Sequence, residues 1–332
     1  MRLGTADTAE TIAIVAELGN NHEGDMACAR ELVHAAAGAG AHAVKLQAID
    51  PPRLVRPSET ARLAQLEGYR LSQEQHAELA ELARSLGLGY CCTPFDLDTV
   101  DWLAPLVDAL KIASADNDLV ALIERAAASG QPLIISTGLS DDATIERALL
   151  AAAAAPEVAL LHCVSAYPTP PERAALASIP ALAARHRVTV GYSDHTLGID
   201  ACVAAAAAGA RILEKHLTLD HEQSDFRDHQ LSAEPDELRA LVERVSGVQA
   251  LLGSPRTGLF AEEQGVQQAG RRSIVAAREL PAGRVIAPDD ITWLRPRDGL
   301  APGQEDLLLG HRLRRAIAAG APIGTDDVEA AP

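Results

Sequence analysis

Residues 188–216 read VTVGYSDHTLGIDACVAAAAAGARILEKH and decide the fold. An apolar segment is followed by a polar loop, an alanine-rich helical run closed by Gly209, and a second apolar segment. The same rhythm gives eight such segments along the chain: TIAIVAELG, HAVKLQ, LGYCCTP, ALKIAS, PLIIST, VALLHCVS, VTVGYSDH and RILEKH. Eight strands alternating with helices over about 250 residues are typical of a (β/α)8 TIM barrel. A doubly wound open sheet would share the alternation, but no glycine-rich phosphate loop follows the first segment. The sequence therefore predicts an α/β fold with a TIM barrel.

The chain changes in character near residue 252. Helical runs are expected before this point at residues 26–39, 74–86, 119–129 and 142–155, several of them closed by a left-handed glycine. Residues 271–330 are instead rich in β-branched residues, proline and glycine, which predicts a small domain of short strands. We therefore expect a barrel over residues 1–252, a linker over 253–270 and a second domain over 271–330.

Composition argues against several kinds of partner. The 332 residues carry a net charge of −17 and few aromatic side chains (Phe 3, Tyr 4, Trp 2), so nucleic acid and anionic membranes are not expected partners. The five cysteines are odd in number and lack zinc-type spacing, as in a reducing compartment. The N-terminus does not read as a signal peptide, and the longest alanine stretch, Ala148–Ala155, is shorter than the roughly 20 residues that span a bilayer. We predict a cytoplasmic location.

Lysine is rare in this chain. Only Lys45, Lys111 and Lys215 occur among the 29 basic residues, so the other 26 are arginine. An ammonium group is a compact point charge suited to phosphate, whereas guanidinium is a planar fork. All three lysines lie in predicted strands, but strand alternation turns Lys215 away from the face that carries its two neighbours. Lys45 and Lys111 are therefore expected to face the barrel interior.

Polar residues collect at the end of every predicted strand, where TIM barrels carry their functional side chains. They are Glu17, Asn20, Asn21, His22, Lys45, Gln47, Thr93, Lys111, Ser114, Ser136, Thr137, His162, Ser165, Tyr167, Ser193, Asp194, His195, Glu214 and His216. A single polar residue at such a place is usually a cap or a loop hydrogen bond. Their presence at all eight strand ends indicates one shared site.

Two kinds of chemistry are expected within this set. His195 and His216 end neighbouring strands beside Glu214, which suits a divalent cation such as Mn²⁺ with open positions for water or substrate. A cradle for a phosphate and a carboxylate is predicted from Lys45, Lys111, Thr93, Ser114, Ser136 and Ser193. A Schiff-base lysine, as in barrel aldolases, is the alternative interpretation, and it predicts no metal.

Nine motifs occur in order along the chain: AELGNNHEGD, VKLQ, CTPFD, KIAS, STG, LHCVSAYPTP, GYSDHTLG, LEKHLTLD and DHQLSAEP. They resemble the sialic acid synthase family, and SIVAARELPAGRVIAPDDITWLRP resembles that family's C-terminal antifreeze-like (SAF) domain. Members condense phosphoenolpyruvate with an N-acetylmannosamine-type sugar to make nonulosonic (sialic) acids, and they depend on a divalent metal. The resemblance implies the same activity here.

The resemblance also implies roles for particular residues. It places the metal on His195 and His216, with Mn²⁺ as the expected ion and Mg²⁺ or Co²⁺ as alternatives. The residues expected to be catalytic are Glu17, Lys45, Lys111 and Glu214. The residues expected to bind the two substrates are Asn21, Gln47, Thr93, Ser114, Asp116, Ser136, Ser165, Tyr167, Ser193, Asp228 and Arg295. Arg295 would come from the SAF domain of the partner chain in a domain-swapped homodimer.

Some positions depart from what is common in bacterial sialic acid synthases. They are Asp116, Ser165 and the stretch HEQSDFRD that ends at Asp228. All of them fall around the expected sugar pocket, so synthesis of legionaminic or pseudaminic acid from a diacetamido-trideoxyhexose is an alternative activity. A Schiff-base aldolase and a sugar- or ice-binding protein are more remote alternatives.

Overall fold

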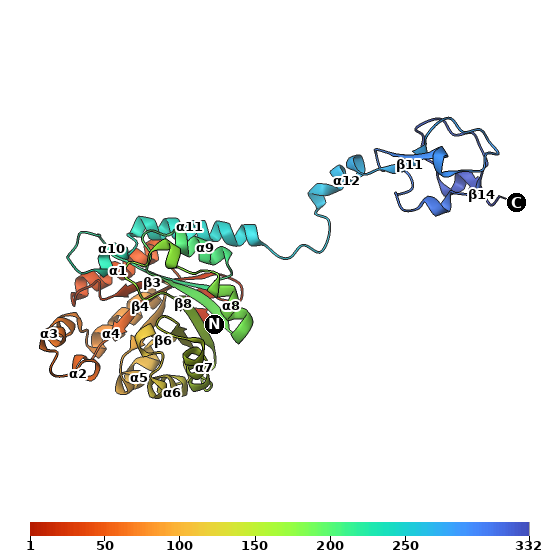
Figure 1. Ribbon diagram of the computed structural model, residues 1–332. Helices are drawn as coiled ribbons and strands as arrows, with labels where there is room; N and C mark the ends of the chain where they lie inside the picture. Colours follow the sequence, from red (N-terminus) through yellow and green to blue (C-terminus); the bar gives the residue numbers. More distant parts are fainter. Residues whose placement is uncertain (332) are drawn as a thin grey trace. The chain divides into compact units, whose positions relative to one another are not determined.

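The computed structural model describes residues 1–331. The chain forms two compact units, one over Met1–Gly253 and one that begins at Ser254. In the first unit, eight parallel strands close into a barrel in the order β10-β3-β4-β5-β6-β7-β8-β9 (Figure 1). They are β3 (Ala13–Gly19), β4 (Ala43–Ala48), β5 (Gly89–Pro94), β6 (Ala109–Ile112), β7 (Leu133–Ser136), β8 (Val158–Cys163), β9 (Thr189–Asp194) and β10 (Ile212–His216). Each predicted apolar segment supplies one strand, so the predicted TIM barrel is confirmed.

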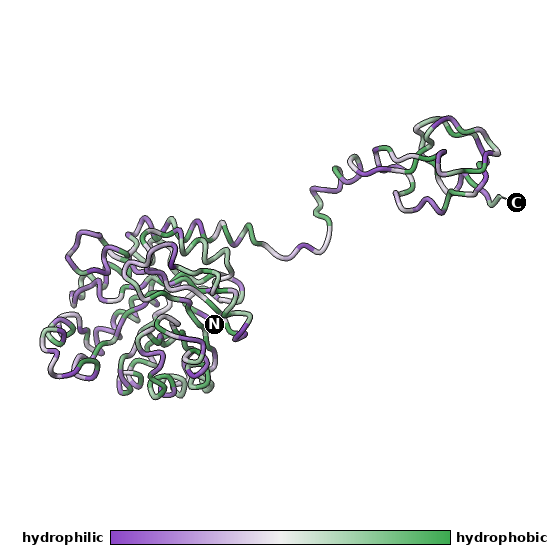
Figure 2. Tube along the Cα trace, viewed as in Figure 1, coloured by the Kyte–Doolittle hydropathy of each residue, from purple (hydrophilic) through white to green (hydrophobic). Residues whose placement is uncertain are grey.

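Helices surround this barrel (Figure 1). They are α1 (Met26–Ala39), α2 (Pro51–Leu54), α3 (Thr60–Tyr69), α4 (Gln73–Ser85), α5 (Leu97–Leu103), α6 (Val120–Ala128), α7 (Asp142–Ala151), α8 (Ser178–His186), α9 (Asp200–Ala207), α10 (Asp228–Leu231) and α11 (Pro235–Leu252). Hydrophilic and hydrophobic residues alternate along α11 in Figure 2, as in a helix with one face on the core. The helix predicted over 142–155 ends earlier, at Ala151, with Ala152 as its C-cap residue.

Side chains alternate between two cores along the barrel strands. In β3, Ile14 and Leu18 belong to the large cluster between strands and helices. Ala13 and Val15 belong to a smaller cluster of mostly short side chains inside the barrel. Glu17 follows on the same inward face two residues later. The barrel interior is therefore apolar near its N-terminal end and polar at its C-terminal end.

Residues 1–8 close the N-terminal end of the barrel. β1 (Arg2–Leu3) pairs with β2 (Ala6–Asp7), and Leu3 and Ala6 are buried in the inner cluster. Gly4 joins the two strands with a φ of 56°, and a Cβ at this position would lie 2.3 Å from the carbonyl oxygen of His42. Glycine is the residue that tolerates both this φ and this close approach. The hairpin plugs one end of the barrel, which leaves the opposite end for chemistry.

The second unit has its own small core. β11 (Ser273–Ala276) pairs with β12 (Ile291–Leu294), and β13 (Arg312–Leu313) pairs with β14 (Val328–Glu329). Buried aliphatic side chains from these strands and their loops form one cluster. The predicted linker over 253–270 contains a short helix, α12 (Gln264–Gly270). Over the described residues 1–331, no helix combines the length and the apolar character needed to cross a bilayer.

Candidate active site

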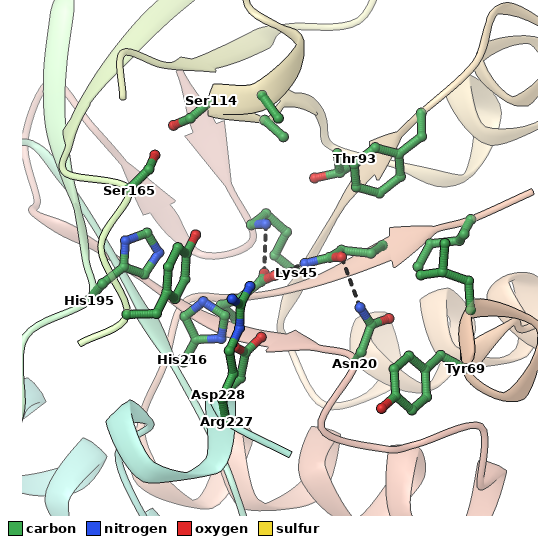
Figure 3. Close-up of a pocket in the computed structure, with 18 of the residues that line it drawn as sticks. Asn20, Lys45, Tyr69, Thr93, Ser114, Ser165, His195, His216, Arg227 and Asp228 are labelled. Atoms are coloured by element: carbon green, nitrogen blue, oxygen red, sulfur yellow. Dashed lines mark hydrogen bonds and ion pairs between the residues drawn. The ribbon is translucent and has the colours of Figure 1, made fainter. Parts of the chain in front are cut away.

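The C-terminal ends of the barrel strands surround a cavity of about 1140 Å³. The sequence-predicted residues that line it are Glu17, Lys45, Gln47, Thr93, Lys111, Ser114, Asp116, Ser136, Ser165, Tyr167, Ser193, His195, Glu214, His216 and Asp228. In Figure 3, Ser165 and His195 lie on one side of this cavity, Asn20 and Tyr69 lie on the other, and Lys45 lies between them. One cavity thus brings together all the predicted site residues except Asn21 and Arg295.

Two lysines and two glutamates form a buried charged cluster in this cavity. The ammonium of Lys45 lies 2.7 Å from Glu17 Oε2 and 3.9 Å from Glu214 Oε1. Lys111 Nζ lies 3.7 Å from the same Glu214 oxygen and donates a hydrogen bond of 2.6 Å to Ser136 Oγ. The four charged side chains are at most 7% exposed. This charged cluster has two positive and two negative groups in direct contact.

Burial and mutual attraction set the protonation of the charged cluster. Burial raises the pKa of Glu17, and the attraction of Lys45 only partly offsets it. Burial also acts to raise the pKa of Glu214, but Lys111 and Lys45 outweigh it and hold that pKa below its ordinary value. Burial acts to lower the pKa of Lys45, but Glu17 and Glu214 outweigh it and raise the pKa. Glu214 is therefore the more firmly ionised carboxylate, and Glu17 takes up a proton more readily.

The two predicted metal ligands lie side by side. The ring centroids of His195 and His216 are 5.5 Å apart. His195 Nδ1 lies 2.9 Å from the carbonyl oxygen of Val164, which can only accept, so Nδ1 carries a proton and Nε2 is the nitrogen left for a ligand. Burial lowers the pKa of His216 well below its ordinary value, and its Nδ1 is buried without a hydrogen-bond partner. Burial acts to lower the pKa of His195, but the contact with Cys163 outweighs it and raises the pKa. Unprotonated imidazole nitrogens fit a borderline divalent cation, so such an ion would compete with a proton at His195 but not at His216.

The histidine pair has no third ligand of the usual type. Among residues 1–331, no group of three or more His, Cys, Asp or Glu side chains is placed to hold a metal ion. The other coordination positions of an ion on His195 and His216 would therefore fall to water or to substrate oxygens. Such open positions are typical of a catalytic ion and not of a structural one.

A second part of the cavity carries polar atoms without protein partners. Asp116 Oδ2 and Ser165 Oγ are buried and have no hydrogen bond to the described residues. Burial raises the pKa of Asp116 to about 6, and the nearby charge of Asp118 adds to the effect. Gly138 packs between two serines, since a Cβ there would lie 2.5 Å from Ser165 Oγ and 2.6 Å from Ser114 Oγ. Unpartnered polar atoms in a cavity wall are suited to the hydroxyl groups of a ligand.

Arg227 connects the two residues that the resemblance places near the sugar. Its guanidinium group lies 4.8 Å from the centre of the Tyr167 ring, and its Nε donates a hydrogen bond of 3.3 Å to Asp228 Oδ1. The Tyr167 ring in turn lies 4.2 Å from the ring of His195. Arg227 was not predicted as a site residue, because only its contacts reveal that it holds Tyr167 and Asp228 together.

An apolar wall of the cavity was also not predicted. It consists of Ile49, Leu54, Val55, Leu66, Tyr69 and Phe226. The rings of Tyr69 and Phe226 are 5.3 Å apart, and they join α3 to the loop after β10. The one signal in the sequence is the long interval between the second and third strand segments, which has room for α2, α3 and α4.

The structure corrects the prediction for Asn21. Its Nδ2 donates to the carbonyl oxygen of Leu217 at 2.8 Å and to Ser232 Oγ at 2.9 Å, and the side chain is fully buried outside the cavity. Asn20 lines the cavity instead and donates to Gln47 Oε1 at 3.1 Å. The alternation of side chains breaks at Gly19, where φ is 50° and the register of β3 shifts. Asn21 thus has a structural role in place of the predicted substrate contact.

Arg295 lies in the second unit, directly after β12, and its side chain is exposed. Its expected contact involves a second copy of the chain, so this role stays a prediction.

Three other polar strand-end residues bond to backbone and not to the cavity. His22 Nδ1 accepts from the Gly24 amide, the His162 ring bonds the carbonyl oxygen of Ala174, and Thr137 donates to the carbonyl oxygen of Leu161. These are the loop hydrogen bonds expected of isolated polar residues at strand ends. The predicted outward direction of Lys215 is confirmed, since its ammonium pairs with Asp194 on the outer face of the barrel.

Two family models match the chain. The model of the NeuB family matches residues 32–257, which includes most of the barrel. The model of the SAF domain matches residues 271–329, from the strand β11 to the strand β14.

Individual relatives match over nearly the full length. The chain is 38% identical over 309 residues to an uncharacterized protein of Methanocaldococcus jannaschii, covering 92% of this chain and 91% of that protein. It is 35% identical over 340 residues to the N,N'-diacetyllegionaminic acid synthase of Legionella pneumophila, covering 96% of this chain and 95% of that protein. Among solved structures, the N-acetylneuraminic acid synthetase of Leptospira borgpetersenii matches with a TM-score of 0.74 and 34% identity, over 77% of this chain and 90% of that one.

Proposed function

The chain belongs to the NeuB family, and we propose that it is a nonulosonic acid synthase. It condenses phosphoenolpyruvate with an N-acylated amino-sugar aldehyde and releases phosphate. The observation that carries this proposal is that the charged cluster and the pair His195 and His216 line one cavity. A substrate that carries both a phosphate and a carboxylate needs fixed cations, and an aldehyde oxygen that gains charge needs an electrophile beside it.

Lys45 and Lys111 are the proposed partners of the phosphate and carboxylate groups of phosphoenolpyruvate. The chain as a whole carries a charge of −17, so local cations must supply the attraction for this anion. The proposed hydrogen-bonding groups around it are the cavity hydroxyls of Thr93, Ser114, Ser136, Ser165 and Ser193. Lys111 already bonds Ser136, and Ser193 donates to Glu214 at 2.9 Å, so part of this cradle is held in place by the protein.

His195 and His216 are the proposed metal ligands, with Mn²⁺ as the expected ion. When bound, a divalent cation supplies Lewis-acid polarisation of the aldehyde oxygen of the sugar. The protein contributes two imidazoles and leaves the other positions open.

In the proposed reaction, C3 of phosphoenolpyruvate forms a bond to the aldehyde carbon, water adds to C2, and phosphate leaves from the tetrahedral intermediate. Glu17 is the proposed carrier of the proton that the water loses, because its raised pKa suits a general acid and base. Gln47 orients this carboxyl group by donating to Glu17 Oε1 at 3.1 Å. Glu214 stays ionised between the two lysines and orients them.

The acceptor sugar has two candidates. The first is an N-acetylmannosamine-type sugar. The apolar wall favours the second, a diacetamido-trideoxyhexose, because a deoxy carbon and a second acetamido methyl group can pack on Tyr69 and Phe226. Phe226 lies two residues before Asp228, so this wall is continuous with the part of the cavity assigned to the sugar. The relative from Legionella pneumophila, named for diacetyllegionaminic acid synthesis, points to the same class.

We also propose a domain-swapped homodimer and a cytoplasmic location. Arg295 follows Trp293 and Leu294, which are 40% and 46% exposed in the second unit. Leu139, which is 76% exposed, lines the cavity of the barrel, so both surfaces have apolar area that a second copy can cover. All five cysteines are free thiols, as in a reducing compartment.

A panel of acceptors tests the proposed function. N-acetylmannosamine, its 6-phosphate and 2,4-diacetamido-2,4,6-trideoxyhexoses are each incubated with phosphoenolpyruvate and Mn²⁺, and phosphate release and product mass are measured. We expect a product with the mass of sugar plus phosphoenolpyruvate plus water minus phosphoric acid. A lysine adduct trapped by borohydride, together with activity that survives EDTA, would instead identify a Schiff-base aldolase and refute the proposal.

A further inference from the structure

We propose that the buried ion pair of Lys215 and Asp194 is a positioning device that sets the separation of His195 and His216. The inference rests on the proposed metal site. It concerns the outer face of the barrel, which the proposed reaction does not touch.

Lys215 and Asp194 are the residues that immediately precede the two histidines. They are cross-strand partners in the register of β9 and β10. Their charged groups lie 2.9 Å apart, and both side chains are 0% exposed. Because side chains alternate along a strand, the ion pair lies on the outer face while His216 faces the cavity. The pair is thus on the same two strands as the histidines, on the other side of the sheet.

The ammonium of Lys215 holds the backbone on both sides of His195. It donates to Asp194 Oδ2 before the histidine and to the carbonyl oxygen of Thr196, at 2.6 Å, after it. The other carboxylate oxygen of Asp194 accepts from the Thr196 amide at 2.9 Å. Residues 194–196 therefore form a closed turn around one cation, and that cation belongs to the residue before His216.

The carboxylate of Asp194 has no freedom left to move. In addition to Lys215 and the Thr196 amide, it accepts from Tyr192 Oη at 3.1 Å and from Cys202 Sγ at 3.5 Å. These four donors come from β9, β10, the loop between β9 and α9, and α9. A fully bonded anion of this kind fixes geometry, because any displacement would break a buried hydrogen bond.

The location of the pair argues for positioning and against a simple role in stability. Buried ion pairs are often no more stabilising than apolar residues of the same volume, and this interface is otherwise apolar. The chain also uses lysine at only three positions, and the other two face the cavity. Asp194 and the Thr196 carbonyl need a cation that donates to both, and an arginine in place of Lys215 can also supply two donors, so Lys215→Arg should bind Mn²⁺ more nearly like the wild type than Lys215→Met does. Partners that hydrogen-bond a metal ligand typically change metal affinity 10- to 100-fold when they are removed. The Lys215–Asp194 pair acts through the backbone beside the ligands, so we expect an effect at the low end of that range.

The test is a titration of the metal-free enzyme with Mn²⁺. Electron paramagnetic resonance measures the Mn²⁺ that stays free in solution. Three variants are compared: Lys215→Met, which removes the ammonium, the double variant Lys215→Met with Asp194→Asn, which leaves no unpaired charge, and Lys215→Arg. The matched control is Asp290→Asn, because Asp290 is equally buried and salt-bridged to Arg278 and Arg284 in the second unit. Circular dichroism establishes that each variant is folded.

We expect the double variant to fold and to bind Mn²⁺ about 10-fold more weakly. Its activity at limiting Mn²⁺ should fall by a similar factor and recover at saturating Mn²⁺, whereas Asp290→Asn should leave Mn²⁺ affinity unchanged. A folded double variant with wild-type Mn²⁺ affinity overturns the positioning role while the proposed function stands. Loss of folding in all three variants also overturns it, since the pair would then be a stability element. A wild-type enzyme that binds no Mn²⁺ overturns the metal site and the inference together.

Discussion

Replacement of Asp116 by asparagine should make the protein more stable at neutral pH and less able to bind its acceptor sugar. Asp116 lies in the cavity with Oδ2 buried and unpartnered, and burial raises its pKa from 3.8 to about 6. This difference corresponds to about 3 kcal/mol at 1.36 kcal/mol per pKa unit. Because the side chain is partly exposed, we expect about 1–2 kcal/mol of this in the free energy of unfolding.

The sign follows from proton linkage. The pKa of Asp116 is higher in the folded chain than in the unfolded chain, so the folded chain holds this proton more tightly. The contribution of Asp116 to stability therefore falls as pH rises from about 4 to about 6, and the full penalty is present above that range. Asparagine does not ionise, so Asp116→Asn should be more stable than wild type at pH 8 and should lose this advantage as pH falls toward 4.

The same variant should change the pH dependence of substrate binding. An ionised Asp116 accepts a charge-assisted hydrogen bond from a sugar hydroxyl, so in the wild type the KM for the acceptor should fall as pH rises through about 6. Asp116→Asn should have a KM about 5- to 10-fold higher at pH 8, from the loss of about 1 kcal/mol, and no step near pH 6. The KM for phosphoenolpyruvate should be unchanged.

The assays are urea denaturation of the variant and the wild type between pH 4 and pH 8, and steady-state phosphate release over the same range. Asp118→Asn is the matched control, because Asp118 is exposed, two residues away, and acts on Asp116 only through its charge. In Asp118→Asn, the KM for the acceptor should still change with pH, but the midpoint of that change should lie at a slightly lower pH. Equal stability of Asp116→Asn and wild type at pH 8, or an unchanged step near pH 6 in the variant, would refute the reasoning.

Four further outcomes are expected. Lys111→Met should keep the fold and lower kcat/KM for phosphoenolpyruvate by about 10²- to 10³-fold in the phosphate-release assay, because it removes a buried ammonium bonded to Ser136; retention of full activity would contradict the proposed cradle. EDTA should abolish activity, Mn²⁺ should restore it, and titration of the metal-free enzyme should give no Mn²⁺ binding to His216→Ala. Phe226→Ala should raise KM for a diacetamido-trideoxyhexose by at least about 5-fold more than for N-acetylmannosamine, since truncation removes the ring that packs on Tyr69; an equal effect on both sugars would argue against the apolar wall as a specificity element. Arg295→Ala should raise the KM for the acceptor. A mixture of Arg295→Ala chains and Lys111→Met chains should recover activity only if the arginine of one chain acts in the cavity of the other. Sedimentation equilibrium would show independently whether the chain is a dimer.

Strand alternation is the reason that most of the site could be predicted from sequence. A strand has a strict period of two, so once β10 is recognised, Glu214 and His216 share one face and Lys215 takes the other. The same rule places Lys45 with Gln47. The family resemblance, and not alternation, assigned Asn21 to the substrate. Alternation does not extend to Asn21, because Gly19, with a φ of 50°, breaks the period at the last residue of β3. A one-residue shift there exchanged Asn20 and Asn21 between the cavity and the protein interior.

The parts of the cavity outside the strands had no such rule. The apolar wall depends on the packing of α3 against the loop after β10, where Tyr69 meets Phe226 across more than 150 residues of chain. No periodic pattern relates two such segments. The role of Arg227 likewise depends on contacts with Tyr167 and Asp228 that only a folded loop creates. Sequence therefore predicted the cavity residues on strands better than the cavity residues on loops.

Charge balance in the cavity links its two kinds of site. The charged cluster sums to zero, because Glu17 and Glu214 neutralise Lys45 and Lys111. Phosphoenolpyruvate, a trianion, would leave this buried cavity strongly negative if it bound alone, in a chain whose net charge is already −17. Two features reduce this cost: Glu17 has a raised pKa and takes up a proton readily, and the pair His195 and His216 is suited to a dication. A bound dication lowers the free energy of binding the anion, and the bound anion lowers the free energy of binding the dication. By linkage, each must increase the affinity for the other by the same factor. With the proposed substrate and metal, the pairing of lysines with glutamates would make the cavity selective for the anion and the cation together, which lysines alone would not do.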